Sequence, residues 1–231
     1  MLVNVKKNTI YFRFFVILLT FNLIISCKST SSYQTTKIEG KKIGVTNEKG
    51  ENEAIVNYVK PYSDNINKDL NSVLAYCPET QDKSKGTWQS NIGNLLAEIT
   101  FKLGNPVFQK RENKTIDVCL LNHGGIRAVI PKGDVTTRTA FEVMPFENSL
   151  IIVGLTGKEI KTLAEYIIKE KKPHPLYGMK IYIDKSTLKI NKIEINNLPL
   201  DENRIYYVGT SDYLANGGDN MTFFKESKIK F

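Results

Sequence analysis

Histidine is scarce in this sequence of 231 residues, and the groupings of side chains that bind catalytic metals are missing. Only His123 and His174 are present, and no cluster of Asp or Glu surrounds either of them at the spacing of metal ligands. The three cysteines, Cys27, Cys77 and Cys119, form no C-x-x-C pair. Zinc sites and dinuclear metallohydrolase centres both need such ligand sets. We therefore expect no metal site, no cofactor and no catalytic residue in this chain.

Long runs of basic residues are also absent. The chain has 32 Lys and Arg against 24 Asp and Glu, a net charge of +8, but residues of the two signs alternate along the chain. A surface that binds nucleic acid needs a basic stripe or patch, so we expect neither DNA nor RNA as a partner. The modest positive excess suits an anionic small ligand, and it equally suits solubility.

No apolar run is long enough for a membrane-spanning helix. Residues 14–25 are twelve mostly Phe, Ile, Leu and Val residues, whereas a spanning helix needs roughly 20. Basic residues precede this run, as in a secretory signal peptide. The run leads into Ser26-Cys27, which resembles the lipobox of bacterial lipoproteins. We expect residues 1–26 to be a lipoprotein signal peptide and Cys27 to carry the lipid; an ordinary signal peptide with an incidental cysteine is the alternative.

The predicted lipid anchor implies a location in the bacterial cell envelope, on the periplasmic side or exposed at the surface. Several acyl chains on one cysteine anchor a protein firmly, whereas a single chain gives marginal binding. Residues 27–40 are polar and lack apolar periodicity, which predicts a flexible tether. The envelope permits a disulfide bond between Cys77 and Cys119, but their spacing does not show whether they meet.

The rest of the chain, residues 41–231, is predicted to form a single α+β domain in which helices flank a mixed β-sheet. In the predicted helix 90–104, Ser90 is the candidate N-cap, Gly104 the candidate stop, and Leu95, Ile99 and Leu103 share one face. Further helices are expected at 54–71, with Pro61 as a kink or start, and at 137–143 and 157–171. Strands are expected at 41–45, 72–76, 117–121, 149–155, 179–183, 190–195 and 205–209.

Two loops each join a Gly-Gly pair to fixed polar side chains. Residues 122–127 read Asn-His-Gly-Gly-Ile-Arg, and residues 213–219 read Tyr-Leu-Ala-Asn-Gly-Gly-Asp. Paired glycines permit positive φ angles and let a ligand approach the main chain. Arg127 offers a planar set of donors for phosphate or ribose oxygens, and Asp219 can accept from adjacent hydroxyls. A pair of simple tight turns is the plainer interpretation.

Two aromatic residues stand beside turns and not within regular apolar patterns. Phe146 follows Pro145, and Tyr213 begins the second Gly-Gly loop. A purine base needs flat apolar faces, and stacking on an aromatic side chain contributes roughly 1–3 kcal/mol per base. The alternative is that both rings belong to the core, which is the commoner place for Phe and Tyr.

Four segments together resemble the C-terminal domain family of the 5'-nucleotidases. They are residues 122–127, 143–148 (Val-Met-Pro-Phe-Glu-Asn), 155–157 (Leu-Thr-Gly) and 213–219, and residues 90–95 match the N-x-G-N-L stretch of the same family. The resemblance covers residues 45–227. It implies that this domain holds the nucleoside while a separate metallophosphatase domain supplies two metals and the attacking hydroxide.

Carried over by position, the resemblance implies a set of substrate-binding residues. Phe146 and Tyr213 would sandwich the base, Asn122 would bond its edge, and Arg127 and Asp219 would hold ribose and phosphate oxygens. The whole expected set is Asn122, Gly124, Gly125, Arg127, Phe146, Asn148, Tyr213, Asn216, Gly217, Gly218 and Asp219. One position departs from the family, because Trp88 stands where an arginine is usual. Lys83 and Lys85 are the candidates to compensate; Trp88 itself is expected in the core or at the rim.

The resemblance and the missing metal ligands lead to two hypotheses from different classes. In the first, the chain is the nucleotide-binding part of a split 5'-nucleotidase, inactive alone, and a separate metallophosphatase chain with divalent metals hydrolyses the phosphate ester in nucleotide catabolism. In the second, it is a lipoprotein that captures nucleosides or nucleotides without catalysis. A degenerate remnant is a third possibility, but it conflicts with the retained Asn122, Arg127, Phe146 and Asp219.

Overall fold

The computed structural model describes residues 3–24, 33–46 and 49–231, which divide into two units, residues 1–52 and 53–231. The first unit holds helix α1 (Val3–Ile24), followed by a described segment, 33–46, without regular secondary structure. None of the described helices combines the length and apolar character that crossing a membrane requires. Cys27, the predicted lipidation site, lies outside the described residues.

The strand expected at residues 41–45 is wrong. This segment is extended but pairs with no other part of the described chain, and Ile43 and Val45 are 81% and 94% exposed. A strand is stabilised by cross-strand pairs and by burial of one face. The alternating apolar residues were therefore a weak indication, because no partner strand or core lies against them.

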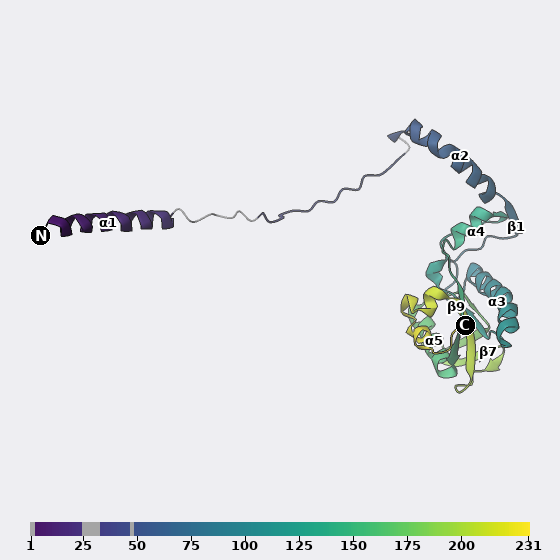
Figure 1. The fold of residues 1–231 in the computed structure, drawn as a ribbon. Helices are drawn as coiled ribbons and strands as arrows, with labels where there is room; N and C mark the ends of the chain where they lie inside the picture. The colour runs from purple at the N-terminus through teal and green to yellow at the C-terminus, as the bar shows by residue number, and fades with distance from the viewer. Residues whose placement is uncertain (1–2, 25–32, 47–48) are drawn as a thin grey trace. The chain divides into compact units, whose positions relative to one another are not determined.

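The second unit contains all the strands and most of the helices of the described chain (Figure 1). Its helices are α2 (Glu53–Leu70), α3 (Asn91–Glu112), α4 (Thr137–Val143), α5 (Gly157–Glu170), α6 (Asp212–Ala215) and α7 (Thr222–Glu226), with short 3-10 turns η2 (His123–Gly125) and η3 (Gly218–Asn220). Its strands are β1 (Val73–Cys77), β2 (Val118–Leu120), β3 (Gly133–Thr136), β4 (Leu150–Thr156), β5 (Leu176–Tyr177), β6 (Met179–Ile183), β7 (Ile190–Ile195), β8 (Leu198–Pro199) and β9 (Ile205–Ser211).

The central sheet is mixed, as expected. Its order is β4-β9-β2-β5, with β2 and β9 parallel and the other neighbours antiparallel. Two smaller antiparallel sheets accompany it, one of β1 and β3 and one of β6, β7 and β8. The α+β class and the mixed sheet flanked by helices are confirmed.

Alternating side chains of the central sheet pack into two cores, one on each face of the sheet. Val118 and Leu120 point into the larger core, which α5, α6 and α7 cover, whereas Cys119 between them joins Phe108 of α3 on the other face. Figure 1 shows α3 and α5 on opposite sides of β9. Successive residues of a strand point to opposite faces, so the continuous apolar run of β2 reflects burial on both sides.

Helix α3 is longer than the sequence pattern indicated. Ser90 is the N-cap, with its Oγ accepting from the Gly93 amide, but the helix passes through Gly104 and ends at Glu112, where Asn113 is left-handed. A Cβ atom at Gly104 would lie 2.4 Å from Leu150. Gly104 is therefore a point of close packing against β4 and not a helix stop.

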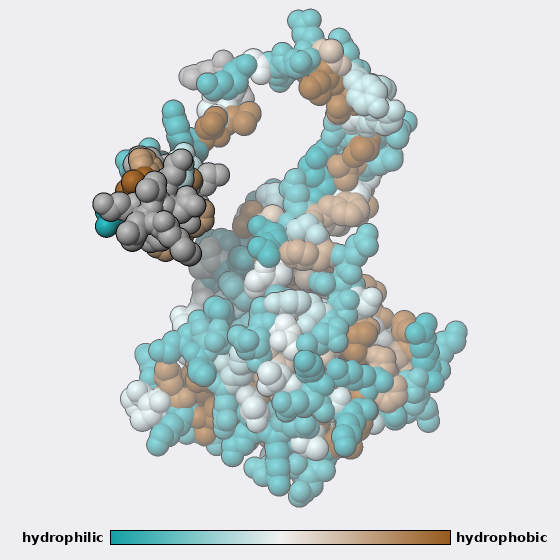
Figure 2. Space-filling view, turned by 60° about the vertical axis from the view of Figure 1, so that its left-hand side comes forward, coloured by the Kyte–Doolittle hydropathy of each residue, from teal (hydrophilic) through white to brown (hydrophobic). Residues whose placement is uncertain are grey.

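The apolar face of α3 formed by Leu95, Ile99 and Leu103 is not its core face. Ile99 and Leu103 are 41% and 70% exposed, and the helix buries Ile92, Ala97 and Phe108 instead. None of the residues of helix α2 is buried, and all but Ser63 and Leu70 are exposed. Figure 2 shows apolar side chains along the surface of this unit, among them those of α2. The predicted helix with Pro61 inside it is confirmed.

Cys77 and Cys119 are both buried free thiols, so the disulfide left open by the sequence does not form here. The Cys77 thiol donates to the Glu79 carbonyl oxygen at 2.9 Å. Burial raises the pKa of the Cys119 thiol to about 12. A thiol with so high a pKa carries almost no thiolate at neutral pH and is unreactive.

Candidate nucleoside-binding site

The two Gly-Gly loops meet around one cavity of about 270 Å³. Eight of the expected residues line it: Asn122, Gly124, Gly125, Arg127, Phe146, Asn148, Tyr213 and Asp219. The other three, Asn216, Gly217 and Gly218, shape the second loop without lining the cavity. Residues almost one hundred positions apart in the chain thus converge on a hollow close to the lower end of the range for small-molecule sites, roughly 300–1,000 Å³.

The first loop begins where strand β2 ends. Asn122 precedes the 3-10 turn η2, and its backbone carbonyl accepts from the Gly125 amide at 3.1 Å. A Cβ atom at Gly125 would lie only 2.7 Å from Asn122 Oδ1. The glycine therefore lets the Asn122 amide fold back over the turn and reach the cavity. The parallel pairing of β2 with β9 brings this loop near the chain that follows β9, where the second loop begins.

Phe146 and Arg127 form one wall of the cavity. The Arg127 guanidinium carbon lies 5.2 Å from the centroid of the Phe146 ring, and the Arg127 amide donates to the Val143 carbonyl at the end of α4. Phe146 is 47% exposed, so it is not a core residue. A guanidinium over an aromatic ring is a cation–π contact, which orients both groups. The ring offers a free face, and the guanidinium retains donors for an anionic or hydroxyl oxygen.

Tyr213 forms a second aromatic wall, on helix α6. The Ser211 hydroxyl caps this helix by accepting from the Leu214 amide, and Tyr213 itself is 48% exposed. A Cβ atom at Gly218 would lie 2.5 Å from the Tyr213 ring. Gly218 therefore allows the ring to lie flat on the backbone of its own loop.

Asp219 is held from two sides. The Tyr213 hydroxyl donates to Asp219 Oδ1 at 2.8 Å, and the Tyr166 hydroxyl of α5 donates to the Asp219 backbone oxygen at 2.7 Å. Asp219 has a φ angle of 50°, and Gly217 has one of 90°. Left-handed backbone is uncommon for a residue with a side chain. The two tyrosine bonds keep the loop in this conformation and leave Asp219 Oδ2 available to a ligand.

Burial and neighbouring charges depress the pKa of both histidines near the first loop. Desolvation is the main cause for His123, with Lys83 adding to it. Desolvation is also the main cause for His174, whose side chain is buried. Both imidazoles are therefore neutral at pH 7. Desolvation likewise raises the pKa of the Tyr166 hydroxyl to about 12, which keeps it a hydrogen-bond donor.

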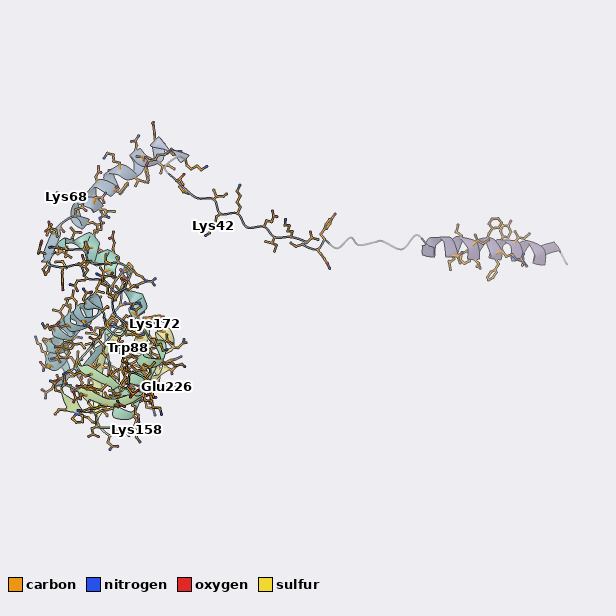
Figure 3. All side chains as sticks on the ribbon, turned by 180° about the vertical axis from the view of Figure 1, so that it is seen from behind. Lys42, Lys68, Trp88, Lys158, Lys172 and Glu226 are labelled. Atoms are coloured by element: carbon orange, nitrogen blue, oxygen red, sulfur yellow. The ribbon has the colours of Figure 1, made fainter. Side chains whose placement is uncertain are left out.

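Trp88, which stands where the family usually has an arginine, and the two lysines considered with it lie in different surroundings. Trp88, labelled in Figure 3, is half-buried and lines a different cavity, together with Ile167 and Met179. Lys83 donates from its ammonium to the carbonyl oxygen of Ile126, the neighbour of Arg127. Lys85 is exposed. Of the two lysines considered, Lys83 is the one beside the first loop.

Two residues that contact the loops were missed by the sequence reasoning. Tyr166 lies on the predicted helix 157–171, and His174 follows that helix. Their contacts with the loops span 53 and 51 positions in sequence. The apolar pattern of α5 explains its buried face, but it gives no indication that Tyr166 reaches Asp219.

Within the described ranges, no three or more His, Cys, Asp or Glu side chains come together to form a candidate metal site. A larger cavity of about 510 Å³ lies on the outer face of α3, with Leu103, Val107, Leu150 and Phe231 among its lining residues. It contains none of the expected binding residues, and most of its lining is apolar, with Thr100, Arg111 and Glu112 as the polar members. The chemistry suited to a polar ligand is therefore at the smaller cavity between the two loops.

Residues 72–226 match the family described as "5'-nucleotidase, C-terminal domain". The chain belongs to this family. The match begins one residue before β1 and ends with α7, so it includes both Gly-Gly loops and the whole cavity. The family resemblance noted from the sequence is confirmed, over a span that starts after α2.

Relatives of the chain are longer proteins. The chain is 28% identical over 163 residues to the trifunctional nucleotide phosphoesterase protein YfkN of Bacillus subtilis, covering 61% of this chain and 10% of YfkN. It is 24% identical over 207 residues to the protein UshA of Escherichia coli, covering 84% and 34%. The crystal structure of a 5'-nucleotidase precursor from Thermus thermophilus superposes with a TM-score of 0.63 at 27% identity, covering 78% and 36%. The chain thus spans about a third or less of these relatives.

Proposed function

We propose that this chain holds the nucleoside part of a nucleotide while a metallophosphatase domain on a separate chain hydrolyses the phosphate ester. The single observation that supports it most is the cavity where Phe146 and Tyr213 meet Asn122, Arg127 and Asp219. Two partly exposed rings offer flat faces to a base. The amide of Asn122 suits a base edge, which presents both donors and acceptors.

The charged groups of the cavity fit the rest of a nucleotide. Asp219 has one carboxylate oxygen bonded to Tyr213 and a second that can accept from ribose hydroxyls. Arg127 is positioned by Phe146, and the Lys83 ammonium is bonded to the carbonyl oxygen of Ile126, the residue before Arg127. Two cations near the cavity favour a phosphate group, because charge-assisted hydrogen bonds to phosphate are strong.

The separate phosphatase chain is proposed on the chemistry of the ester. Phosphate monoesters are among the slowest biological bonds to hydrolyse, and enzymes often cleave them with metal-activated water. The described part of this chain brings no set of metal ligands together. Relatives such as the nucleotide phosphoesterase YfkN are longer proteins, of which this chain matches one part. Divalent metals would then belong to the partner.

The proposal also places the chain in the bacterial cell envelope, held through a lipid on Cys27 by way of the segment 27–40. The support is the sequence of residues 14–27, a short apolar run that ends at a cysteine. Metabolic labelling with a fatty acid tests this part separately. Label on the wild-type chain and none on Cys27→Ser supports the anchor, and equal label on both contradicts it.

Two measurements test the central proposal. Calorimetry on the chain with adenosine, AMP and UDP-glucose measures binding in the absence of any partner. Coexpression with a secreted metallophosphatase of the same organism, followed by AMP hydrolysis, measures the joint activity. Binding that strengthens with the phosphatase chain, together with hydrolysis by the pair alone, supports the split enzyme. Tight binding with no complex and no hydrolysis supports ligand capture instead, and absence of any binding contradicts both.

A further inference from the structure

The short segment after α5, residues 173–175, lies directly against the start of the first loop. The His123 amide donates to His174 Nδ1 at 3.2 Å, and the Leu121 amide donates to the Pro175 carbonyl at 3.0 Å. His123 Nδ1 lies 3.3 Å from the Pro173 carbonyl oxygen. His123 immediately follows Asn122 of the cavity wall. Among these three contacts, the His174 ring is the only side-chain acceptor, and it holds the backbone of the residue next to Asn122.

The same part of the chain also reaches the second loop. Tyr166, on the last turns of α5, donates to the Asp219 backbone oxygen at 2.7 Å. The rings of Tyr166 and His174 lie 5.9 Å apart between centroids, tilted by 55°. The end of α5 and the segment after it therefore contact both loops. His174 bonds the first loop at the His123 amide, and Tyr166 bonds the second loop at the Asp219 carbonyl.

The His174 side chain is only 5% exposed, and its Nε2 has no hydrogen-bond partner among the described residues. Because Nδ1 accepts from the His123 amide, the neutral ring carries its proton on Nε2. Protonation adds a hydrogen to Nδ1, and two N–H groups then face each other. The hydrogen bond that holds the first loop cannot exist in that state.

We propose that His174 is a positioning residue of the nucleoside site, which holds the first loop when neutral and releases it when protonated. The inference rests on the proposed function and adds regulation by pH. Nucleoside affinity should fall in acid, because Asn122 and Gly125 lose the backbone anchor that places them at the cavity. His174 touches no ligand in this scheme and acts through the His123 amide.

The groups around His174 decide where the change occurs. Burial lowers its pKa most, and His123 and Lys172 (labelled in Figure 3) lower it further, whereas Asp219 and the Leu121 carbonyl raise it. Glu170 and Tyr166 also face the ring. Since the pKa of His174 is lowered from 6.5, the loop is held at neutral pH and is released only in more acidic solution, on the acid side of 6.5.

Calorimetry with adenosine between about pH 5 and about pH 8 tests the proposal on the full chain, since a nucleoside has no phosphate to titrate in this window. The adenosine affinity of the wild type should be roughly threefold to tenfold weaker at the acid end of this range than at the neutral end, because one hydrogen bond contributes about that much. His174→Gln keeps an acceptor that cannot titrate, so its affinity should stay flat. His174→Leu has no acceptor and should bind weakly at every pH. His123→Gln is the matched control, because it removes the other histidine ring and keeps the backbone amide, so it should retain the step.

A second measurement separates this inference from the proposed function. In the His123→Gln background, which removes the imidazole that would itself shift this resonance, the backbone amide at position 123 should titrate with pH while His174 is present and in no His174 variant, whether or not a ligand is present. A titrating amide without adenosine binding sinks the nucleoside function and leaves the loop switch standing. Adenosine binding with a flat pH profile, or with a step that survives in His174→Gln, overturns the role of His174. Binding that weakens in acid only where His174 is present supports both.

Discussion

The two Gly-Gly loops look alike in the sequence, yet the structure uses their glycines for different reasons. In the first loop neither glycine has a positive φ angle, and Gly125 is needed because Asn122 Oδ1 folds back to within 2.7 Å of where a Cβ would be. In the second loop Gly217 has a φ angle of 90°, and Gly218 makes room for the Tyr213 ring. One loop thus uses glycine to position an amide, and the other to position an aromatic face.

The loops also differ in how they are held. The second is closed on itself by Tyr213 and Asp219, with Tyr166 adding a bond from outside. The first has a short 3-10 turn of its own, and its bonds from outside include one to the titratable His174 ring. A loop held by a titratable acceptor is sensitive to pH, whereas a tyrosine with a pKa of about 12 stays a donor over the whole physiological range. Ligand affinity should therefore respond differently to changes in the two loops.

The largest expected effect comes from Gly218→Ala. Gly218 does not have a positive φ angle, so its backbone accepts alanine, and the added methyl acts by displacing the Tyr213 ring, whose atoms would lie 2.5 Å from it. Loss of one stacking face amounts to about 1–3 kcal/mol, which predicts that adenosine affinity measured by calorimetry falls by roughly fivefold to 150-fold. Gly124→Ala is the matched control in the first loop, because its Cβ would meet Asn122 Nδ2 at 3.6 Å, an ordinary contact.

If Gly218→Ala and Gly124→Ala lost the same adenosine affinity at unchanged melting temperatures, the glycine beside the Tyr213 ring would be no more important for binding than a glycine of the first loop. Melting temperatures are part of the measurement because a general loss of stability would weaken binding in either variant. A large loss in Gly124→Ala alone would instead place the ligand against the backbone of the first loop.

A smaller loss is expected from Phe146→Ala. This change removes the other stacking face and the cation–π contact that orients the Arg127 guanidinium. The Phe146 ring contacts Arg127 on the first loop's side of the cavity, so the Tyr213 face of the second loop should remain in place. We expect adenosine affinity to fall by about fivefold to tenfold. Phe141→Ala is the control, since Phe141 is a 63% exposed phenylalanine on α4 outside the cavity lining. No change in Phe146→Ala would mean that the base stacks on Tyr213 alone.

The contrast between the loops shows which parts of the molecule a sequence can reveal. Apolar periodicity located α5 and the strands β2, β4 and β9 of the central sheet, though not the two-residue β5, because burial on two faces leaves a clear pattern in neighbouring residues. The cavity residues followed from four short segments in a familiar order, and eight of the eleven meet around one cavity. Local sequence carries both kinds of information.

What the sequence could not reveal depends on contacts between distant residues. Nothing near Gly104 indicates that β4 lies against it, so a glycine that permits close packing was read as a helix stop. The 41–45 segment has a strand-like pattern and no partner in the described chain. The supports of the loops, Tyr166 and His174, are about fifty positions from the backbone that they hold. Such roles appear only when the chain is folded.

A still smaller effect is expected at Lys83, and it should depend on the ligand. Its ammonium is bonded to the Ile126 carbonyl beside Arg127, so Lys83→Met should weaken AMP by roughly threefold to fivefold and leave adenosine unchanged. Lys85→Met is the control, because Lys85 is exposed and lies two positions away. The AMP loss should diminish with added salt, because ions in solution screen a charge that is only partly buried. Equal weakening of adenosine and AMP would assign Lys83 to holding the loop and not to the phosphate.

The smallest effect is expected from Tyr213→Phe, which keeps the aromatic face and removes the hydroxyl that bonds Asp219 at Oδ1 and at its amide. These bonds are exposed, and the Tyr166 bond still holds the Asp219 backbone, so adenosine affinity should fall by less than about threefold. Tyr166→Phe removes the partly buried support instead and should weaken binding more than Tyr213→Phe does. If Tyr213→Phe weakened binding more than Tyr166→Phe, the second loop would be held mainly by its own Tyr213–Asp219 bond and not by Tyr166 of α5.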